Sequence, residues 1–242
     1  MSVFRSFFVT AVIVCLLQPV MVRADTIALI GTGEVSAAFG PRMAALGHTI
    51  IYGSRSPERE EVRAMVAQTG KGASAATPAA AAATADIVML AVPWTVAEEV
   101  VRGLGDLSGK IILDPVNPRI IDEDGFRDFP DGTSNAERIQ NLVPTAFVVK
   151  AFNTISTDSM LDPDLLGHPL TIPIAGNDAA AKQTVAALIE ALGYEAVDVG
   201  PVRYAHVIEG LYLLRANARD LLGTHFEYHF RPRETAAPQT IR

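Results

Sequence analysis

The chain has a single cysteine, Cys15, which lies in an apolar run near the amino terminus. One cysteine cannot form an internal disulfide, and residues 25–242 offer no thiol as a nucleophile or metal ligand. Positive charge is also scarce, because 20 lysines and arginines stand against 27 acidic residues, for a formal net charge of -7. Such a surface disfavours nucleic acid and anionic membranes as partners.

The sequence also lacks a recognisable catalytic constellation. No spacing indicates a Ser-His-Asp arrangement or a pair of catalytic carboxylates. His225 and His229 have the i, i+4 spacing of zinc ligands, but no other ligand is near them in the sequence, so we interpret them as part of a solvated turn and predict no metal site. His206 and Glu209, three residues apart on a predicted final helix, are interpreted as a surface pair.

Residues 1–24 are similar to a secretory signal peptide. Arg5 precedes an apolar run from Phe7 to Leu17, and Val22-Arg23-Ala24 is typical of a cleavage site. The run is shorter than the roughly 20 apolar residues of a membrane span, so we expect no span after processing. We therefore predict a protein exported to the periplasm or the medium. If translation starts at Met21, the alternative is a cytoplasmic protein.

The most informative stretch begins with the apolar run at residues 27–30. Gly31-Thr32-Gly33 follows directly, and after it come a helical pattern over 34–46 and a second apolar run over 49–52. This order of strand, glycine turn, helix and strand is typical of the first unit of a dinucleotide-binding fold. An ordinary strand-to-helix turn is the alternative. Ser36 stands where the usual pattern has its third glycine, which is a mild departure.

Apolar runs and helical patterns continue to alternate along the chain. Strands are predicted at 26–30, 49–52, 87–92, 110–113, 146–151, 170–175 and 194–199, and helices at 34–46, 57–69, 77–85, 96–102, 134–141, 178–192 and 203–222. Residues 119–133 show no periodicity and are expected to form a surface loop. The alternation predicts an α/β fold, a doubly wound parallel sheet of the Rossmann type with a small C-terminal α/β extension.

We expect this fold to divide into several parts. A nucleotide-binding domain is predicted at residues 25–155, and a small C-terminal domain that covers the cleft at 156–222. The segment 223–242 lacks an apolar pattern after Phe230 and is expected to be a flexible tail.

The end of the second strand predicts which nucleotide is bound. NAD-binding proteins have a carboxylate there for the ribose 2′-hydroxyl, whereas this chain has Gly53-Ser54-Arg55 and no acid before Glu58. Ser54 can donate a hydrogen bond to a 2′-phosphate, and the Arg55 guanidinium can bind that phosphate with two hydrogen bonds. A solvated loop arginine is the alternative. The motif favours NADP over NAD.

Two further motifs fall where predicted strands end, at the edge of the sheet that binds ligands in such folds. Ala91-Val92-Pro93-Trp94 follows one strand, and Trp94 offers either a flat wall for a ligand or packing in the core. Asn153-Thr154 follows another strand. Its amide and hydroxyl are candidates to position a nicotinamide carboxamide or an acceptor ring, and no other catalytic side chain is predicted.

Together with Asp198-Val199-Gly200-Pro201, these motifs resemble the NADPH-dependent F420 reductases (F420:NADP oxidoreductases) over about residues 26–222. The resemblance implies hydride transfer between NADPH and coenzyme F420, a deazaflavin, and it suggests a homodimer. Carried onto this chain, it implies a pyrophosphate site, a 2′-phosphate site, and a lining for the nicotinamide and the acceptor. The pyrophosphate site comprises Gly31, Thr32, Gly33, Glu34 and Val35, and the 2′-phosphate site comprises Ser54 and Arg55. The lining for the nicotinamide and the acceptor comprises Val92, Pro93, Trp94, Asn153, Thr154 and Ile155.

Two departures from the family leave the acceptor open. Archaeal members often have histidine where this chain has Asn153, and they have no export signal. Ferric reductases of the same fold pass hydride to a flavin, so a flavin is the alternative acceptor. A nucleotide-binding redox sensor or partner subunit without turnover is a second alternative. A pyrroline-carboxylate reductase or 3-hydroxyacid dehydrogenase is disfavoured, because two strands and only one long final helix are predicted after Thr154.

Overall fold

The computed structural model describes residues 24–231, so the predicted signal peptide up to residue 23 and the tail after residue 231 lie outside the described residues. No helix within this range has the length and apolarity needed to cross a membrane. The strands are β1 (Thr26–Ile30), β2 (Thr49–Gly53), β3 (Ser74–Ala76), β4 (Ile87–Leu90), β5 (Ile111–Asp114), β6 (Ile120–Ile121), β7 (Arg127–Asp128), β8 (Phe147–Lys150), β9 (Thr171–Gly176) and β10 (Glu195–Asp198). The helices are α1 (Glu34–Ala45), α2 (Glu60–Thr69), α3 (Pro78–Thr84), α4 (Trp94–Arg102), α5 (Asn135–Leu142), α6 (Thr157–Leu161), α7 (Ala179–Ala191), the 3₁₀ turn η1 (Val202–Tyr204) and α8 (Ala205–Leu222).

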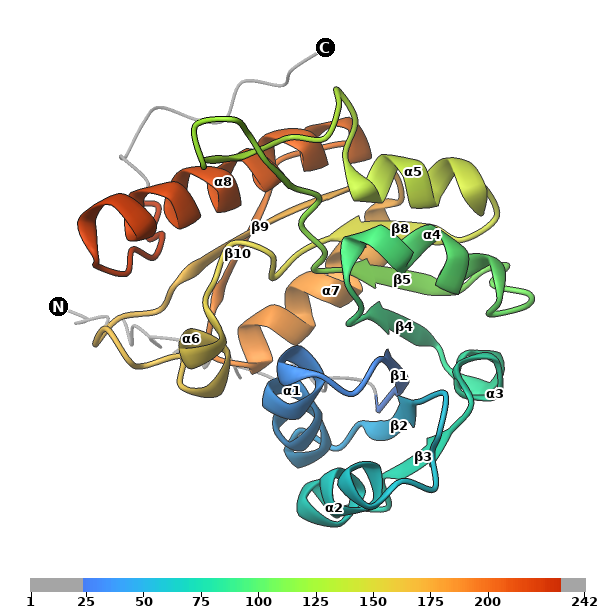
Figure 1. Ribbon diagram of the computed structural model, residues 1–242. Coiled ribbons are helices and arrows are strands. Elements are labelled where there is room, and N and C mark those ends of the chain that lie inside the picture. The colour runs from blue at the N-terminus through green and yellow to red at the C-terminus, as the bar shows by residue number, and fades with distance from the viewer. Residues whose placement is uncertain (1–23, 232–242) are drawn as a thin grey trace, which may run out of the picture.

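Most of the described strands join one sheet, in the order β10-β9-β8-β5-β4-β1-β2-β3 (Figure 1). From β3 to β8 all neighbours are parallel, and the chain reverses its direction of winding between β1 and β4. β9 then pairs antiparallel with β8, and β10 runs parallel to β9. The predicted doubly wound parallel sheet with a C-terminal α/β extension is therefore confirmed. The domain boundary at residue 155 stays a prediction.

Helices cover both faces of the sheet, because successive strand residues point to opposite sides. Ile27 and Leu29 of β1 join the core cluster under α1 and α7, whereas Ala28 and Ile30 join the cluster under α3, α4 and α5. All four side chains are essentially inaccessible to solvent. This two-sided burial explains why the parallel strands read as continuous apolar runs in the sequence.

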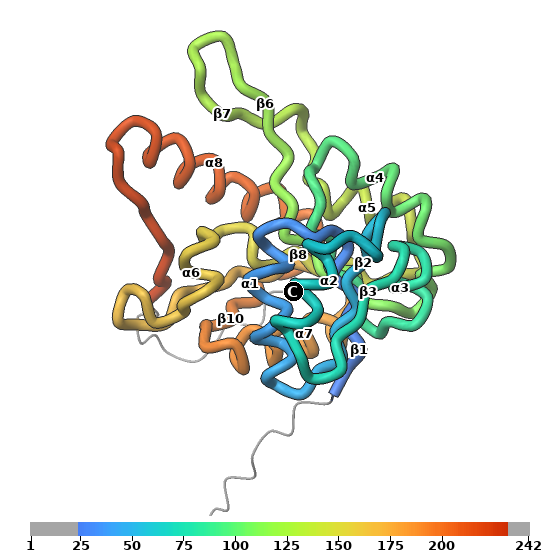
Figure 2. The backbone as a smooth tube through the Cα atoms, turned by 60° about the horizontal axis from the view of Figure 1, so that its bottom comes forward, coloured from blue at the N-terminus to red at the C-terminus, as the bar shows by residue number. Residues whose placement is uncertain are grey.

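The loop predicted at residues 119–133 contains a short hairpin, β6–β7, which projects from the body of the molecule beside α8 (Figure 2). Its position depends on a partner distant in sequence. The Arg127 amide donates to Asn217 Oδ1 over 2.9 Å, and Asn217 Nδ2 donates to the Arg127 carbonyl over 2.8 Å. Strands of two residues carry almost no periodic signal, so the sequence pattern could not predict them.

Residues 224–230, which were expected to be part of a flexible tail, are instead hydrogen-bonded to the fold. The Thr171 amide of β9 donates to the Tyr228 carbonyl over 2.9 Å, and the Phe230 amide donates to Thr171 Oγ1 over 2.8 Å. Glu227 Oε1 accepts hydrogen bonds from the Ser156 amide and Ser159 Oγ, each 2.9 Å long. These contacts satisfy backbone groups of the strand and of the α6 entrance, which gives the stretch a fixed course without apolar periodicity.

Candidate functional site

The glycine turn after β1 lies where three strand ends meet. Gly31 has φ +110°, and an added Cβ would lie only 2.2 Å from the Ala91 carbonyl oxygen, so the turn requires glycine here. The Gly31 amide also donates to the Gly53 carbonyl over 2.9 Å. The ends of β1, β2 and β4 are thereby joined at the carboxyl edge, where open α/β sheets bind their ligands.

The first turn of α1 provides the setting for a pyrophosphate. Gly33 is the residue that caps the helix, with extended backbone and no side chain to bond the first helical amides. An added Cβ on Gly33 would meet nothing within 4 Å, so the space in front of the helix is open. Unsatisfied amides and the positive end of the helix dipole make such a position a ready anion site.

Ser36 accommodates the departure from the usual glycine pattern. Its buried hydroxyl donates to the Gly31 carbonyl over 2.7 Å and so stabilises the turn. The close packing of α1 on β2 instead depends on Gly40, where an added Cβ would lie 1.9 Å from the Tyr52 hydroxyl oxygen. α1 continues as a helix through Pro41 to Ala45, although proline inside a helix usually kinks or breaks it.

The loop after β2 presents the predicted 2′-phosphate ligands. Ser54 is buried, and its Oγ accepts a hydrogen bond from the Ser56 amide over 3.2 Å, which leaves the hydroxyl proton to donate. Arg55 is exposed. Arg59, which sequence reasoning missed, caps α2 four residues further on, and its Nε lies 3.3 Å from Glu61 Oε2. Two exposed guanidinium groups on one short loop suit recognition of a phosphate.

A cavity of about 440 Å³ adjoins the glycine turn at the same edge. Its lining combines α1, the loops after β5 and β8, α6 and α8. The lining residues are Glu34, Val35, Pro115, Asn117, Arg119, Phe152, Asn153, Ile155, Ser156, Thr157, Asp158, Met160, Tyr212, Arg215, Arg219 and His225. Of the predicted site residues, Glu34, Val35, Asn153 and Ile155 are brought together there.

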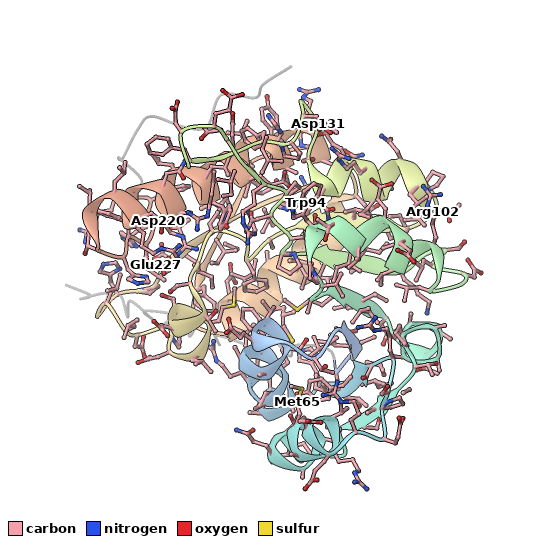
Figure 3. All side chains as sticks on the ribbon, in the orientation of Figure 1. Met65, Trp94, Arg102, Asp131, Asp220 and Glu227 are labelled. Carbon is pink, nitrogen blue, oxygen red and sulfur yellow. The ribbon has the colours of Figure 1, made fainter. Side chains whose placement is uncertain are left out.

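The other predicted site residues after β4 and β8 do not line this cavity. Trp94 is the first residue of α4 (Figure 3). It packs partly against the core cluster under α3, α4 and α5. Val92 packs against the same cluster, and Thr154 is fully buried. Pro93 is exposed and precedes α4. Roles for these four residues toward a ligand stay predictions.

The turn after β8 is the most strained part of the site. Phe152 is fully buried at φ +63°, a left-handed conformation that costs about 1–3 kcal/mol for a residue other than glycine and is concentrated at functional sites. The turn aims Asn153 Nδ2 at Asn117 Oδ1, over 2.9 Å, and at the Ile208 carbonyl, over 3.2 Å. Buried Asn153 Oδ1 and Thr154 Oγ1 have no hydrogen-bond partner within the described residues. Such unpaired buried oxygens are rare, and only Asn153 of the two residues lines the cavity.

A larger hollow of about 620 Å³ lies at the opposite edge of the sheet. Asp25, His48, Asp86 and Lys110 line it, and each of them precedes a strand. It is remote from the glycine turn, and parallel α/β sheets bind nucleotides at the carboxyl ends of their strands. We therefore locate the candidate site at the carboxyl edge.

Residues 26–118 match the profile of a family described as "NADP oxidoreductase coenzyme F420-dependent". The amino-terminal part of the chain is therefore similar to this family. The F420-dependent NADP reductase of Methanocaldococcus jannaschii is 29% identical over 216 residues, which cover 82% of this chain and 91% of that protein. A crystal structure of a presumed F420-dependent NADP reductase from Arthrobacter sp. FB24 superimposes with a TM-score of 0.78 at 29% identity, covering 87% of this chain and 100% of the other.

The chain is also similar to part of a longer protein. Metalloreductase STEAP3 of Rattus norvegicus is 26% identical over 193 residues, which cover 79% of this chain. The chain spans only 37% of that metalloreductase. The similarity therefore concerns one part of a larger protein.

Sequence analysis missed a buried charge cluster formed by β5, β8 and α8. Lys150 of β8, Asp114 of β5 and Glu209 of α8 are each no more than 1% exposed. Lys150 Nζ lies 2.6 Å from Glu209 Oε1 and 3.3 Å from Asp114 Oδ2, and it also donates to the Val116 carbonyl. A lysine and an aspartate within otherwise apolar strands were the available signal, since buried charges require partners.

The predicted surface pair between His206 and Glu209 is wrong. Glu209 faces the sheet rather than the solvent, and its Oε1 also accepts a hydrogen bond from the Asn135 amide over 3.0 Å. His206 instead stacks on Phe129, with ring centroids 4.0 Å apart. Helical spacing alone does not say which face of a helix is buried, and here the charged position faces inward.

The stability of the fold should depend on the protonation of Glu209. Burial raises the pKa of Glu209 to about 7; the Lys150 charge opposes this rise, and Asp114 adds to it. The cluster holds one cation and two carboxylates, so protonation of Glu209 makes it neutral. Because the folded pKa lies above the ordinary value of 4.5, the stabilising contribution is complete below pH 4.5 and is lost as the pH rises through 7.

We therefore expect the free energy of unfolding of the wild type, relative to Glu209→Gln, to fall by roughly 3 kcal/mol between about pH 4.5 and 7.5. Urea unfolding at several pH values in this range measures the difference. Glutamine keeps an oxygen for the Lys150 and Asn135 donors but does not titrate. A constant difference between the two proteins over the whole range would contradict the assignment.

Proposed function

We propose that this NADP oxidoreductase transfers a hydride between NADPH and a deazaflavin, coenzyme F420, or a flavin bound in the 440 Å³ cavity. The proposal rests on one observation: the cavity and the candidate pyrophosphate site share residues. Glu34 and Val35 at the start of α1 line the cavity, and the same turn is the candidate pyrophosphate site. A nicotinamide lying across this edge would face an acceptor ring in the cavity.

In this proposal the protein acts by positioning. Direct hydride transfer needs little help from acids or bases, because holding the two rings at reacting distance supplies most of the rate. Gly31 to Val35 would hold the pyrophosphate, and Val92 to Trp94 would border the nicotinamide. Asn153, which lines the cavity, would accept a hydrogen bond from the carboxamide or the acceptor ring on Oδ1. Thr154 Oγ1 also has no partner within the described residues, but it is enclosed, so it would contribute only if the turn moves.

The test is NADPH oxidation, followed at 340 nm, with F420, FMN, FAD or no acceptor. Faster oxidation with one of these compounds supports the proposal and identifies the ring system. Tight NADPH binding with no turnover for any acceptor would instead favour the alternative of a redox sensor or a partner subunit. Similarity to a metalloreductase supports a third candidate, an NADPH-dependent flavin or ferric reductase, which a ferric chelate added with the flavin would detect.

We expect Arg55→Ala to weaken NADPH binding by roughly 10- to 100-fold, because a hydrogen-bonded charge contributes about 1.5–3 kcal/mol. NADH lacks the 2′-phosphate, so its affinity should not change. Titration calorimetry with both nucleotides measures the effect. Arg63→Ala removes an equally exposed arginine from the middle of α2 and serves as the matched control. Equal losses for NADPH and NADH would show that Arg55 does not bind the 2′-phosphate.

A homodimer and export also belong to the proposal. α8 exposes large apolar side chains at a spacing of seven residues, with Val207 63%, Leu214 62% and Leu221 66% exposed. Such a stripe suits antiparallel packing against the same helix of a second copy. Sedimentation equilibrium measures the assembly, and amino-terminal sequencing of the native protein distinguishes export, with Asp25 first, from a start at Met21.

A further inference from the structure

One wall of the acceptor cavity is rich in arginine. Arg119 reaches it from the loop before β6, and Arg215 and Arg219 reach it from α8. The two acids of the lining, Glu34 and Asp158, belong to α1 and to α6, on the side of the glycine turn. The cavity is therefore polarised, with its cationic side away from the proposed pyrophosphate.

Arg215 is the fixed part of this wall. It is 8% exposed, and its nearest carboxylate atom, Glu227 Oε1, lies 3.7 Å away and already accepts two hydrogen bonds from Ser156 and Ser159. One terminal nitrogen donates to the Ile155 carbonyl over 3.3 Å, while the buried Nε has no partner within the described residues. A buried guanidinium with an incomplete set of partners raises the positive potential of the cavity.

The two outer arginines are also incompletely neutralised. Arg219 contacts Asp220 Oδ1 through Nε, over 2.9 Å, but Asp220 is shared with Arg127 of the hairpin. Figure 3 places Asp220 and Glu227 at the same end of α8. Arg119 is exposed and lies over the Tyr212 ring, 5.8 Å from its centroid, with no ion pair among the residues that the structure describes. Asp220 and Glu227 thus serve three guanidinium groups between them, and neither is paired with Arg119.

We infer that the cavity selects a ring acceptor whose side chain carries an anionic group, a phosphate or a carboxylate, bound by Arg119 and Arg219 in front of Arg215. Guanidinium groups bind such anions with paired, charge-assisted hydrogen bonds. Tyr212 and Asn117 also line the cavity and suit the polar chain that would link ring and anion. This inference rests on the proposed function, and it adds that the side chain, as well as the ring, decides which acceptor binds.

The test compares acceptors that have the same ring but differ in charge. FMN and riboflavin form one pair, and F420 and its phosphate-free deazariboflavin form the other. Each is titrated against the NADP-saturated protein, and binding is read from the quenching of ring fluorescence. At least one anionic compound should bind about tenfold more tightly than its neutral counterpart, with an advantage that shrinks as salt rises. Equal affinities within both pairs would overturn the inference.

Variants connect this preference to the arginines. Arg119→Gln and Arg219→Gln should each reduce the affinity for the anionic member about tenfold and leave the neutral member unchanged. Arg203→Gln is the control, because Arg203 also lies over a tyrosine ring, 5.2 Å from the Tyr204 centroid, but outside the cavity. A similar loss for both members of a pair would also overturn the inference. Because binding is measured without turnover, absent NADPH oxidation would count against the proposed function alone.

Discussion

Replacing Lys150 with methionine is expected to lower the free energy of unfolding by about 3–5 kcal/mol, the usual cost of removing one partner from a buried ion pair. Lys150 is the only cation in contact with Asp114 and Glu209 within the described part of the chain, and all three side chains are inaccessible to solvent. Methionine has a similar shape but no charge, so two buried carboxylates would remain without compensation. Urea unfolding at neutral pH measures the loss.

A surface ion pair provides the matched control. Lys182 of α7 lies 2.8 Å from Asp198 Oδ2, and that carboxylate is 50% exposed, so Lys182→Met should cost no more than about 1 kcal/mol. The deficit of Lys150→Met should also shrink at low pH and in the double variant with Glu209→Gln, because either change removes a buried negative charge. Losses of the same size for the two lysines would mean that the buried cluster does not stabilise the fold.

Gly31→Ala is expected to impair both stability and nucleotide binding. Its φ of +110° and the 2.2 Å approach of a Cβ to the Ala91 carbonyl force the turn to move, at a cost of about 2–3 kcal/mol. Movement of this turn would displace the ends of β1, β2 and β4 together, so NADPH affinity should fall by about tenfold or more. Thermal unfolding and nucleotide titration measure the two effects separately.

Gly33→Ala should behave differently, although it lies only two residues away. A Cβ there meets nothing within 4 Å, and the backbone φ of −88° is open to any residue. We expect a loss of no more than about 1 kcal/mol, because glycine is preferred to alanine at a helix N-cap. The methyl group would nevertheless occupy the space proposed for the pyrophosphate, so NADPH affinity should still fall. Full NADPH affinity in Gly33→Ala would place the pyrophosphate elsewhere.

The sequence predicted the parts of the site that are local. The turn at Gly31 directly follows one apolar strand, and Ser54 and Arg55 follow the next. Because these two strands are parallel neighbours, the residues after them lie close together at the carboxyl edge of the sheet. The Asn153 turn was found for the same reason. The left-handed backbone of the neighbouring Phe152 was not predicted, because a positive φ at a phenylalanine leaves no signal in the sequence.

The parts that depend on contacts distant in sequence were missed. Glu209 was read from helical spacing as a surface residue, yet it meets Lys150 from 59 positions away. Glu227, in the segment 224–230, accepts hydrogen bonds from Ser156 and Ser159. No periodic pattern in the sequence predicts this contact. The arginine-rich wall of the cavity likewise combines Arg119, just before β6, with Arg215 and Arg219 of α8. In each case tertiary packing decided the position, and a single sequence does not encode that packing as a local pattern.

The antiparallel pairing of β9 with β8 limits how the protein could admit the two proposed ligands. Many nucleotide-dependent enzymes open by swinging one domain on a hinge. Here Val149 and Lys150 are paired with Gly176 and Ala175, so the chain beyond residue 155 is tied to the nucleotide-binding strands by the backbone itself. We therefore expect traffic through the cavity to depend on small excursions of the β6–β7 hairpin and the 224–230 segment, at rates typical of loops.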